Sequence, residues 1–199
     1  MYISISGLIG SGKTTLATKL SEALNLPVYY EPVVDNVYLK DFYANPAKYS
    51  FPLQVYLLSK RFSQQQQIIW SGKGGVQDRT IYEDGIFAGV LRDSGLMEQR
   101  DYETYQALFE QMSHLMARPS VIIHLDISAE ESLRRIQLRD RECEKSITLE
   151  YLQQLKTAYD SFIERISHQI PVIKLEYNEF IATEKIVDLI KETFHIKLI

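Results

Sequence analysis

The sequence predicts an α/β fold of three layers, in which helices flank a five-stranded parallel sheet. Two observations predict this class. Short apolar runs alternate along the chain with longer segments whose apolar residues recur at helical spacing. Each run is separated from the next by a crossover long enough for a helix, which is typical of a parallel sheet covered on both faces. The length of 199 residues suits one domain, so we expect a single domain over residues 1–199.

The elements can be assigned in chain order. We expect strands at residues 2–6, 27–31, 75–79, 120–126 and 172–176. We expect helices at residues 15–24, 50–70, 82–93, 99–117, 129–139, 147–168 and 182–194. Pro27 and Pro171 stand just before two of the strands, where proline ends the preceding helix without interrupting the strand ladder. Ser128 precedes two acidic residues and predicts an N-cap for the helix over 129–139.

Composition excludes several classes of protein. The formal net charge of −4 argues against nucleic-acid polymers as partners, because their phosphates demand a basic surface. The single cysteine, Cys143, excludes an internal disulfide and a cysteine-rich zinc site. No apolar run approaches the roughly twenty residues of a membrane span, and the first strand begins at Tyr2, so we expect no signal peptide, no membrane partner and a cytoplasmic location.

Residues 7–14 read G-L-I-G-S-G-K-T and match G-x-x-x-x-G-K-[ST] at every fixed position. A strand precedes this loop and a helix follows it, so its backbone N–H groups and the helix N-terminus favour phosphate. Lys13 is placed to reach the β- and γ-phosphates, and Thr14 to bind Mg²⁺. The fold is therefore expected to be P-loop NTPase-like, with ATP and Mg²⁺ as cofactors. The expected phosphate-binding residues are Gly7, Leu8, Ile9, Gly10, Ser11, Gly12, Lys13, Thr14 and Thr15.

Ligands of parallel sheets bind beyond the carboxyl ends of the strands, where Glu31, Asp78 and Arg79 are expected. Pro32 restricts Glu31 to an extended backbone, and the carboxylate there is suited to accept a proton from an attacking hydroxyl. A surface turn is the alternative for Glu31. Asp78 is placed to hold Mg²⁺ through water, and Arg79 to neutralise phosphate charge or to position Glu31.

Gln54 and Arg61 share a largely apolar face of the helix over 50–70. There they are suited to hydrogen-bond the edge of a planar base, although the residues alone favour a position at the rim with solvated heads. Asp84, expected one and a half turns into the next helix, is placed to reach the same cavity as Arg61. A structural ion pair is the alternative for Arg61 and Asp84.

Arginines gather at the end of the helix over 129–139. Arg135 and Arg139 share a face of this helix, and Arg141 follows where it breaks. Guanidinium groups in this arrangement can close over transferring phosphates, so we expect a lid at about residues 135–147. A solvated basic face paired with acids such as Glu131 is the alternative.

Together these motifs resemble the deoxyribonucleoside kinases of the deoxycytidine/deoxyguanosine/deoxyadenosine kinase family, and most closely its bacterial deoxyadenosine/deoxyguanosine kinases. The resemblance covers nearly the whole chain, with G-x-x-G-x-G-K-T at 7–14, E-P-V at 31–33, F-P-L-Q at 51–54, D-R-T at 78–80 and R-x-x-x-R-x-R at 135–141 in the family order. Three positions depart from the family pattern: Asp78 replaces a glutamate, Thr80 a serine, and Asn36 a tryptophan found in several relatives.

The resemblance implies ATP-dependent phosphorylation of the 5′-hydroxyl of a deoxyribonucleoside in nucleotide salvage, by a homodimer. It implies Glu31 as general base with Arg79 near the hydroxyl, Gln54, Arg61 and Asp84 as base-binding residues, Tyr43 and Glu144 as holders of the 3′-hydroxyl, and Arg135, Arg139 and Arg141 as lid arginines.

The pairing of Arg61 with Asp84 suits a base that carries an exocyclic amine beside a ring acceptor. We therefore expect deoxyadenosine first, deoxyguanosine or deoxycytidine second, and thymidine last. The alternatives are a nucleoside monophosphate kinase, such as a thymidylate kinase, and a P-loop module that binds nucleotide without transferring phosphate. A carboxylate base at Glu31 suits a neutral hydroxyl better than a charged phosphate acceptor.

Overall fold

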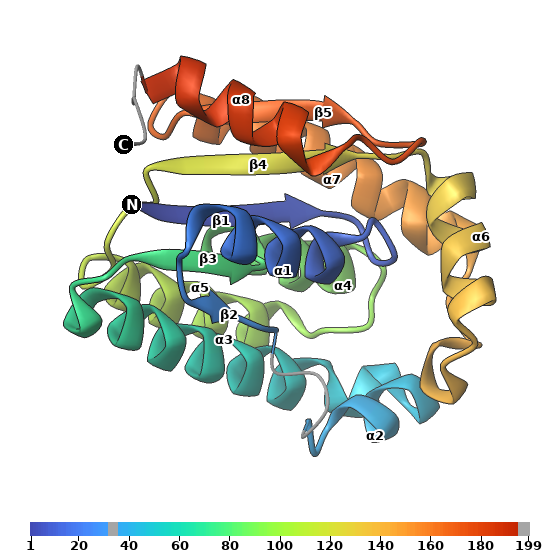
Figure 1. Ribbon diagram of the computed structural model, residues 1–199. Coiled ribbons are helices and arrows are strands. Elements are labelled where there is room, and N and C mark those ends of the chain that lie inside the picture. Colours follow the sequence, from blue (N-terminus) through green and yellow to red (C-terminus); the bar gives the residue numbers. More distant parts are fainter. Residues whose placement is uncertain (32–35, 195–199) are drawn as a thin grey trace.

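The sheet is parallel and five-stranded, as the sequence predicts, and its strand order is β2-β3-β1-β4-β5. The computed structural model describes residues 1–31 and 36–194, apart from the side chain of Cys143. The strands are β1 (Tyr2–Gly7), β2 (Val28–Tyr29), β3 (Gly75–Asp78), β4 (Val121–Asp126) and β5 (Val172–Glu176). All five strands point the same way, so their carboxyl ends share one edge (Figure 1).

Helices flank the sheet on both sides (Figure 1). They are α1 (Lys13–Leu24), α2 (Leu39–Ala44), α3 (Pro46–Ser71), α4 (Asp84–Asp93), α5 (Gln99–Ser113), α6 (Ala129–Arg139), α7 (Leu149–Ser167) and α8 (Thr183–Phe194), with single 3₁₀ turns η1 (Ile81–Glu83) and η2 (Glu142–Glu144). The helix α6 stands across the carboxyl edge of the sheet, and α2 and the start of α3 lie below it.

The central strands β1, β3 and β4 are buried on both faces because helices cover both. Ile3 and Ile5 of β1 and Ile122 and Ile123 of β4 are buried in the core that α1, α7 and α8 complete. A second apolar cluster joins α2, α3, α4 and α5 below the β2 edge, and its buried members include Phe42, Leu58 and Tyr105. The site lies above this second cluster, which holds α3 against α4.

Several boundaries differ from the sequence prediction. The second strand is only Val28–Tyr29, since it is an edge strand that pairs with β3 alone, and Glu31 therefore lies beyond it. The third helix begins four residues earlier than expected, where Asn45 accepts a hydrogen bond from the Lys48 N–H and Pro46 takes the first helical position. The helix α5 ends at Ser113 rather than at residue 117.

The short elements α2 and η2 were not predicted. With six and three residues, they are too short to produce a helical period in the sequence. Asn36, one of the three departures from the family pattern, accepts a hydrogen bond from the Tyr38 N–H just before α2. The N-cap predicted at Ser128 is confirmed, since its hydroxyl accepts a hydrogen bond from Glu131 N–H.

Candidate active site

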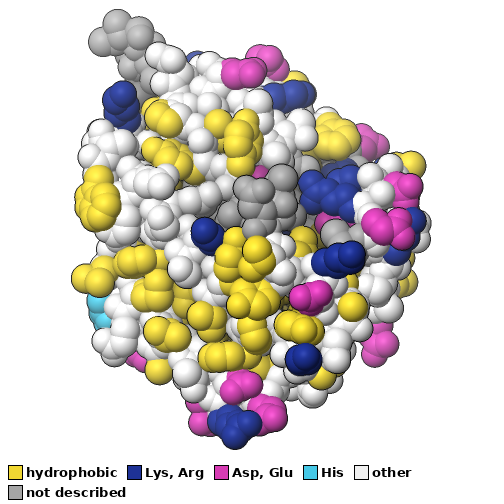
Figure 2. Space-filling view, turned by 90° about the horizontal axis from the view of Figure 1, so that it is seen from below, with side chains coloured by type: hydrophobic (Ala, Val, Ile, Leu, Met, Phe, Trp, Pro, Cys, Tyr) yellow, Lys and Arg dark blue, Asp and Glu magenta, His cyan; other side chains and the backbone are white. Residues whose placement is uncertain are grey.

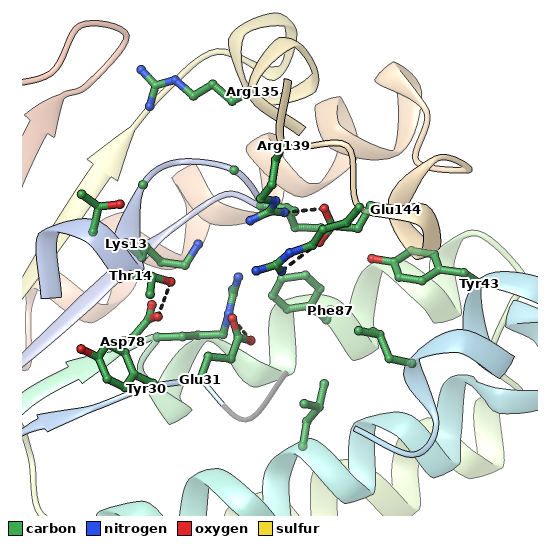
Figure 3. A pocket seen from close by; sticks show the side chains of 18 of the residues that line it. Lys13, Thr14, Tyr30, Glu31, Tyr43, Asp78, Phe87, Arg135, Arg139 and Glu144 are labelled. Carbon is green, nitrogen blue, oxygen red and sulfur yellow. Dashed lines mark hydrogen bonds and ion pairs between the residues drawn. The ribbon is translucent and has the colours of Figure 1, made fainter. Parts of the chain in front are cut away.

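A cavity of about 800 Å³ opens at the carboxyl edge of the sheet, between the glycine loop, α3 and the lid (Figure 3). Most of the predicted site residues line it, although they come from segments far apart in the sequence: Ile9, Gly10, Gly12, Lys13, Thr14, Thr15, Glu31, Tyr43, Gln54, Arg61, Asp78, Arg79, Arg135, Arg139, Arg141 and Glu144. Asp84 lies beneath this lining, fully buried under Arg61. Pro32 and Val33 of the E-P-V motif lie outside the described residues.

The glycine loop turns tightly between β1 and α1. Gly10 and Gly12 have φ angles of 76° and 96°, which a residue with a side chain rarely adopts. Lys13 begins α1, and its Nζ donates to the carbonyls of Gly7 at 3.0 Å and Leu8 at 2.7 Å. Burial and the nearby Arg79 lower the pKa of Lys13 to about 8, against the opposing effect of Glu31. The glycine loop thus places the buried ammonium group of Lys13 at the N-terminus of α1.

Thr14 and Asp78 meet across the floor of the cavity. The Thr14 hydroxyl donates to Asp78 Oδ2 at 2.6 Å, while Oδ1 of the same carboxylate is buried without a hydrogen-bond partner among the described residues. A hydroxyl beside an unsatisfied carboxylate oxygen suits Mg²⁺, which takes oxygen ligands. The described residues hold no group of three or more His, Cys, Asp or Glu side chains able to bind a metal ion.

Glu31 lies between two arginines. Its Oε1 accepts a hydrogen bond from Arg61 Nη2 at 2.6 Å and lies 2.7 Å from Arg79 Nε. Burial raises the pKa of Glu31, but Arg79, Arg61 and Lys13 outweigh it and lower the pKa to about 2. The carboxylate is therefore ionised across the physiological range, and it faces the cavity rather than a surface turn.

Arg61 also forms an ion pair with Asp84. Arg61 and Gln54 are only 2% and 3% exposed, so the interpretation that favoured solvated heads at a rim is wrong. They are buried because α4 and η1 pack over this face of α3. Gln54 Oε1 and Asp84 Oδ2 are buried without hydrogen-bond partners among the described residues. Burial raises the pKa of Asp84, and Arg61 opposes it.

Asp84 is the first residue of α4, not one and a half turns into it. The expected helix over 82–93 is preceded by the 3₁₀ turn η1, which the Thr80 hydroxyl caps by accepting from Tyr82 N–H at 3.2 Å. The Thr80 hydroxyl therefore caps the 3₁₀ turn η1, and a serine hydroxyl at this position could do the same. The change of helix type turns the side chain of Asp84 down toward Arg61.

Tyr43 on α2 and Glu144 on η2 line the cavity on the same side (Figure 3). Glu144 binds the lid arginines, with Oε2 at 2.5 Å from Arg139 Nη2 and Oε1 at 3.5 Å from Arg141 Nη1. The two elements that carry these residues also contact each other. An acceptor held by Tyr43 and Glu144 would therefore touch the lid directly.

Arg135 is placed differently from the other lid arginines. Its guanidinium donates to the carbonyls of Ser11, Tyr177 and Asn178 and lies 4.6 Å from the centre of the Phe180 ring. Arg135 also forms an ion pair with Glu131, the partner named in the alternative of a basic helix face paired with acids. Arg135 therefore joins α6 to the glycine loop and to the segment after β5, while Arg139 is directed toward the cavity (Figure 3). Arg141 also lines the cavity.

Several aromatic residues of the cavity could not be predicted from the sequence. Phe87 on α4 lies 4.9 Å from the Arg79 guanidinium, and Tyr30 bonds the Thr18 hydroxyl at the rim. Phe180 extends the wall beside Arg135. Each stands at an ordinary apolar position of its segment, so nothing in the sequence distinguishes it from a core residue.

The fold and the site define a P-loop kinase whose acceptor side is built around a carboxylate. The family model described as deoxynucleoside kinase matches residues 3–197. This chain belongs to the deoxynucleoside kinase family, and it is an enzyme that phosphorylates deoxynucleosides with ATP. The resemblance inferred from the motifs is confirmed, and the alternatives of a monophosphate kinase and a non-catalytic module are not favoured.

Individual relatives agree with this assignment. The chain is 58% identical over 193 residues to a deoxyadenosine kinase of Dictyostelium discoideum, covering 97% of this chain and 79% of that one. It is 38% identical to a deoxyadenosine/deoxycytidine kinase of Bacillus subtilis, over 97% and 93% of the two chains. The structure is similar to that of the M. mycoides deoxyadenosine kinase with dCMP and dCDP bound, at a TM-score of 0.87, 28% identity and coverage of 98% and 99%.

In the part of the chain that the structure describes, no helix has the length and apolar character needed to cross a membrane.

Proposed function

We propose that the chain, acting as one domain over residues 1–199, phosphorylates the 5′-hydroxyl of deoxyadenosine in preference to other deoxyribonucleosides. The observation that carries this proposal is the position of Glu31. It lies in one cavity with both the glycine loop and Arg61, which Asp84 holds from beneath, so donor phosphate, attacking hydroxyl and base can be held together.

In the proposed reaction, the oxygen of the substrate 5′-hydroxyl attacks the γ-phosphorus of ATP, and the bond between the γ-phosphorus and the oxygen bridging to the β-phosphate breaks. Glu31 accepts the proton of the hydroxyl. With a pKa of about 2, Glu31 is a weak base. The proton is therefore transferred late, once the new phosphorus–oxygen bond has made the hydroxyl acidic. Lys13, Arg79, Arg139 and Arg141 stabilise the charge on the phosphoryl oxygens, and Arg135 holds the lid against the glycine loop.

Thr14 and Asp78 would hold Mg²⁺, directly or through water. When bound, the ion neutralises charge on the donor phosphates. The hydrogen bond between Thr14 and Asp78 keeps both oxygens at the floor of the loop.

Base preference follows from the buried groups above the second apolar cluster. Adenine offers an amine donor beside a ring acceptor, which matches the unpartnered Gln54 Oε1 and the paired Arg61 and Asp84. Thymine has a carbonyl where adenine has the amine, so it would leave a buried acceptor unsatisfied. Tyr43 and Glu144 are proposed to hold the 3′-hydroxyl. The substrates named for the Dictyostelium and Bacillus relatives support an adenine preference, with cytosine as an alternative.

We further propose a homodimer that works in the cytoplasm and takes a small-molecule acceptor, with neither a nucleic-acid polymer nor a membrane as partner. Apolar side chains gather on the face over α3 and α5 (Figure 2). Trp70 of α3 and Leu115 after α5 are 79% and 68% exposed there. The single cysteine suits a reducing compartment, and the net charge of −4 disfavours polyanions.

The test is a panel of deoxy- and ribonucleosides with ATP and Mg²⁺, compared by kcat/KM. We expect deoxyadenosine to be best, deoxyguanosine and deoxycytidine to follow, and thymidine to be poorest. Thymidine as the best substrate would overturn the assignment of Arg61 and Asp84. Phosphorylation of monophosphates without phosphorylation of nucleosides would overturn the proposed acceptor.

A further inference from the structure

The backbone of Arg79 is in the left-handed region, with φ of 73°, immediately after β3. This conformation costs a residue with a side chain on the order of 1 kcal/mol, and it persists only where the surroundings hold it. The N–H of Arg79 donates to Ile5 O of β1 at 3.0 Å, which anchors the main chain. The contacts of the guanidinium supply the rest of the restraint.

Glu83 and Tyr159 hold the Arg79 guanidinium on the side that faces away from the cavity. Arg79 Nη1 donates to the Tyr159 hydroxyl at 2.7 Å and to Glu83 Oε1 at 3.3 Å. Both residues are fully buried. Among the described residues, the cavity lining includes Arg79 but neither Glu83 nor Tyr159, so these two are separated from any substrate by the arginine.

The second oxygen of Glu83 is tied to the sheet. Ser6 of β1, next to the glycine loop, donates from its hydroxyl to Glu83 Oε2 at 2.5 Å. The same hydroxyl lies 3.3 Å from His124 Nδ1 of β4, and the His124 ring stacks on Tyr159 of α7 with centroids 5.8 Å apart. Two strands and a helix therefore fix the position of one buried carboxylate.

This carboxylate is needed because Glu31 cannot hold Arg79 throughout the reaction. Glu31 is shared between Arg61 and Arg79, and its negative charge falls as it takes the proton of the hydroxyl. The attraction that orients Arg79 then weakens at the moment when charge spreads over the phosphoryl group. Glu83 keeps an acceptor beside the guanidinium at every stage.

We propose that Glu83 is a positioning residue, which together with Tyr159 keeps the Arg79 guanidinium directed at Glu31 and the transferring phosphoryl group. This inference rests on the proposed function.

The test compares Glu83→Gln and Tyr159→Phe with wild type. Tyr105→Phe is the matched control, because Tyr105 is also fully buried and its hydroxyl has no hydrogen-bond partner among the described residues. We expect kcat to fall by about tenfold to a hundredfold in the first two variants and by less than about twofold in the control. The KM values for nucleoside and ATP should change by less than about threefold. A general loss of structure would instead weaken substrate binding and raise both KM values.

A double-mutant cycle then asks whether Glu83 acts through Arg79. In an Arg79→Ala background, Glu83→Gln should lower kcat by less than about twofold, since the group it positions is absent. A full additional loss there, or a Glu83→Gln enzyme with wild-type kcat, would overturn the positioning role. If Glu83→Gln does not fold, Tyr159→Phe decides, and a loss no greater than that of Tyr105→Phe overturns the role. A wild-type protein that phosphorylates no deoxynucleoside would instead overturn the proposed function.

Discussion

At the scale of single residues, the central feature is that Glu31 is held by two arginines and stays ionised. Its folded-state pKa of about 2 lies below the ordinary value, so the carboxylate stabilises the fold above about pH 4, and this stability is lost only as the pH falls toward 2. Glu31 is therefore already deprotonated and able to accept a proton. Its low basicity is offset by the positive charge of the residues around the transferred phosphoryl group.

Glu31→Gln removes the proton acceptor while it keeps the shape and a hydrogen-bonding oxygen. We expect kcat to fall by about 10²–10⁴-fold, with ATP binding changed little, because the glycine loop does not depend on this side chain. Single-turnover kinetics and calorimetric titration with ATP measure the two quantities. Glu103→Gln, a change at an exposed carboxylate of α5, serves as control. Near-wild-type turnover by Glu31→Gln would rule out Glu31 as the base.

His124 provides a test by pH, because burial lowers its pKa to about 4. The unfolded chain, in which histidine has a pKa of about 6.5, binds this proton more tightly than the folded protein does. Stability is therefore complete above about pH 6.5 and is lost as the pH falls toward 4, by about 2 kcal/mol between pH 8 and pH 5. Urea unfolding of wild type and His124→Gln at both pH values should give a smaller pH dependence for the variant. An equal dependence in both proteins would contradict this account.

At the scale of elements, the helix α6 is joined to the glycine loop rather than standing apart as a separate lid. The Ser132 hydroxyl donates to Ile9 O at 2.6 Å, and Arg135 donates to Ser11 O at 3.1 Å. A Cβ added at Gly10 would lie 3.1 Å from Ser132 O, so loop and helix are in close contact. These bonds fix the start of the predicted lid to the glycine loop.

Ser132→Ala tests this junction. The change leaves the part-buried Ile9 carbonyl without its donor, which costs about 1 kcal/mol. We expect a lower unfolding free energy and a KM for ATP raised several-fold, with the KM for nucleoside unchanged. Ser161→Ala in α7 removes an exposed hydroxyl that bonds only within its own helix and should change neither quantity. An unchanged KM for ATP in Ser132→Ala would show that the junction does not shape the loop.

At the scale of the whole molecule, the sheet and its helices bring chemistry from distant segments to one edge and leave another face apolar. The cavity joins loops after β1, β2 and β3 with α3 and the lid. Apolar side chains gather on the face over α3 and α5 (Figure 2), and Trp70 of α3 and Leu115 after α5 are exposed apolar residues.

Trp70→Glu tests the proposed dimer, because a charge in the middle of an apolar contact resists burial. We expect sedimentation equilibrium to give twice the chain mass for wild type and a monomer, or a dimer weakened at least about tenfold, for the variant. Val37→Glu alters an exposed apolar residue at the start of the α2 region and should leave the mass unchanged. A monomeric wild type would overturn the proposed dimer.

Local sequence determined much of this protein. The order of strands and helices, the glycine loop and the cap at Ser128 depend on neighbours in the chain, so alternation, helical spacing and motif spacing predict them. The fold also brings together the predicted acceptor residues Glu31, Gln54, Arg61 and Asp84, although their environment could not be predicted from the sequence. The short elements α2 and η2 were not predicted, because a helix of one turn produces no period.

Tertiary structure alone decided which of the alternatives held. Gln54 and Arg61 are buried rather than solvated because α4 and η1 pack over them, and Asp84 starts a helix because η1 precedes it. The separate positions of Arg135 and Arg139, and the support of Arg79 by Glu83 and Tyr159, likewise depend on contacts between segments far apart in the chain. The role of a buried charged side chain depends on the groups that contact it. The packing of the whole molecule decides which groups those are, so the sequence alone does not reveal them.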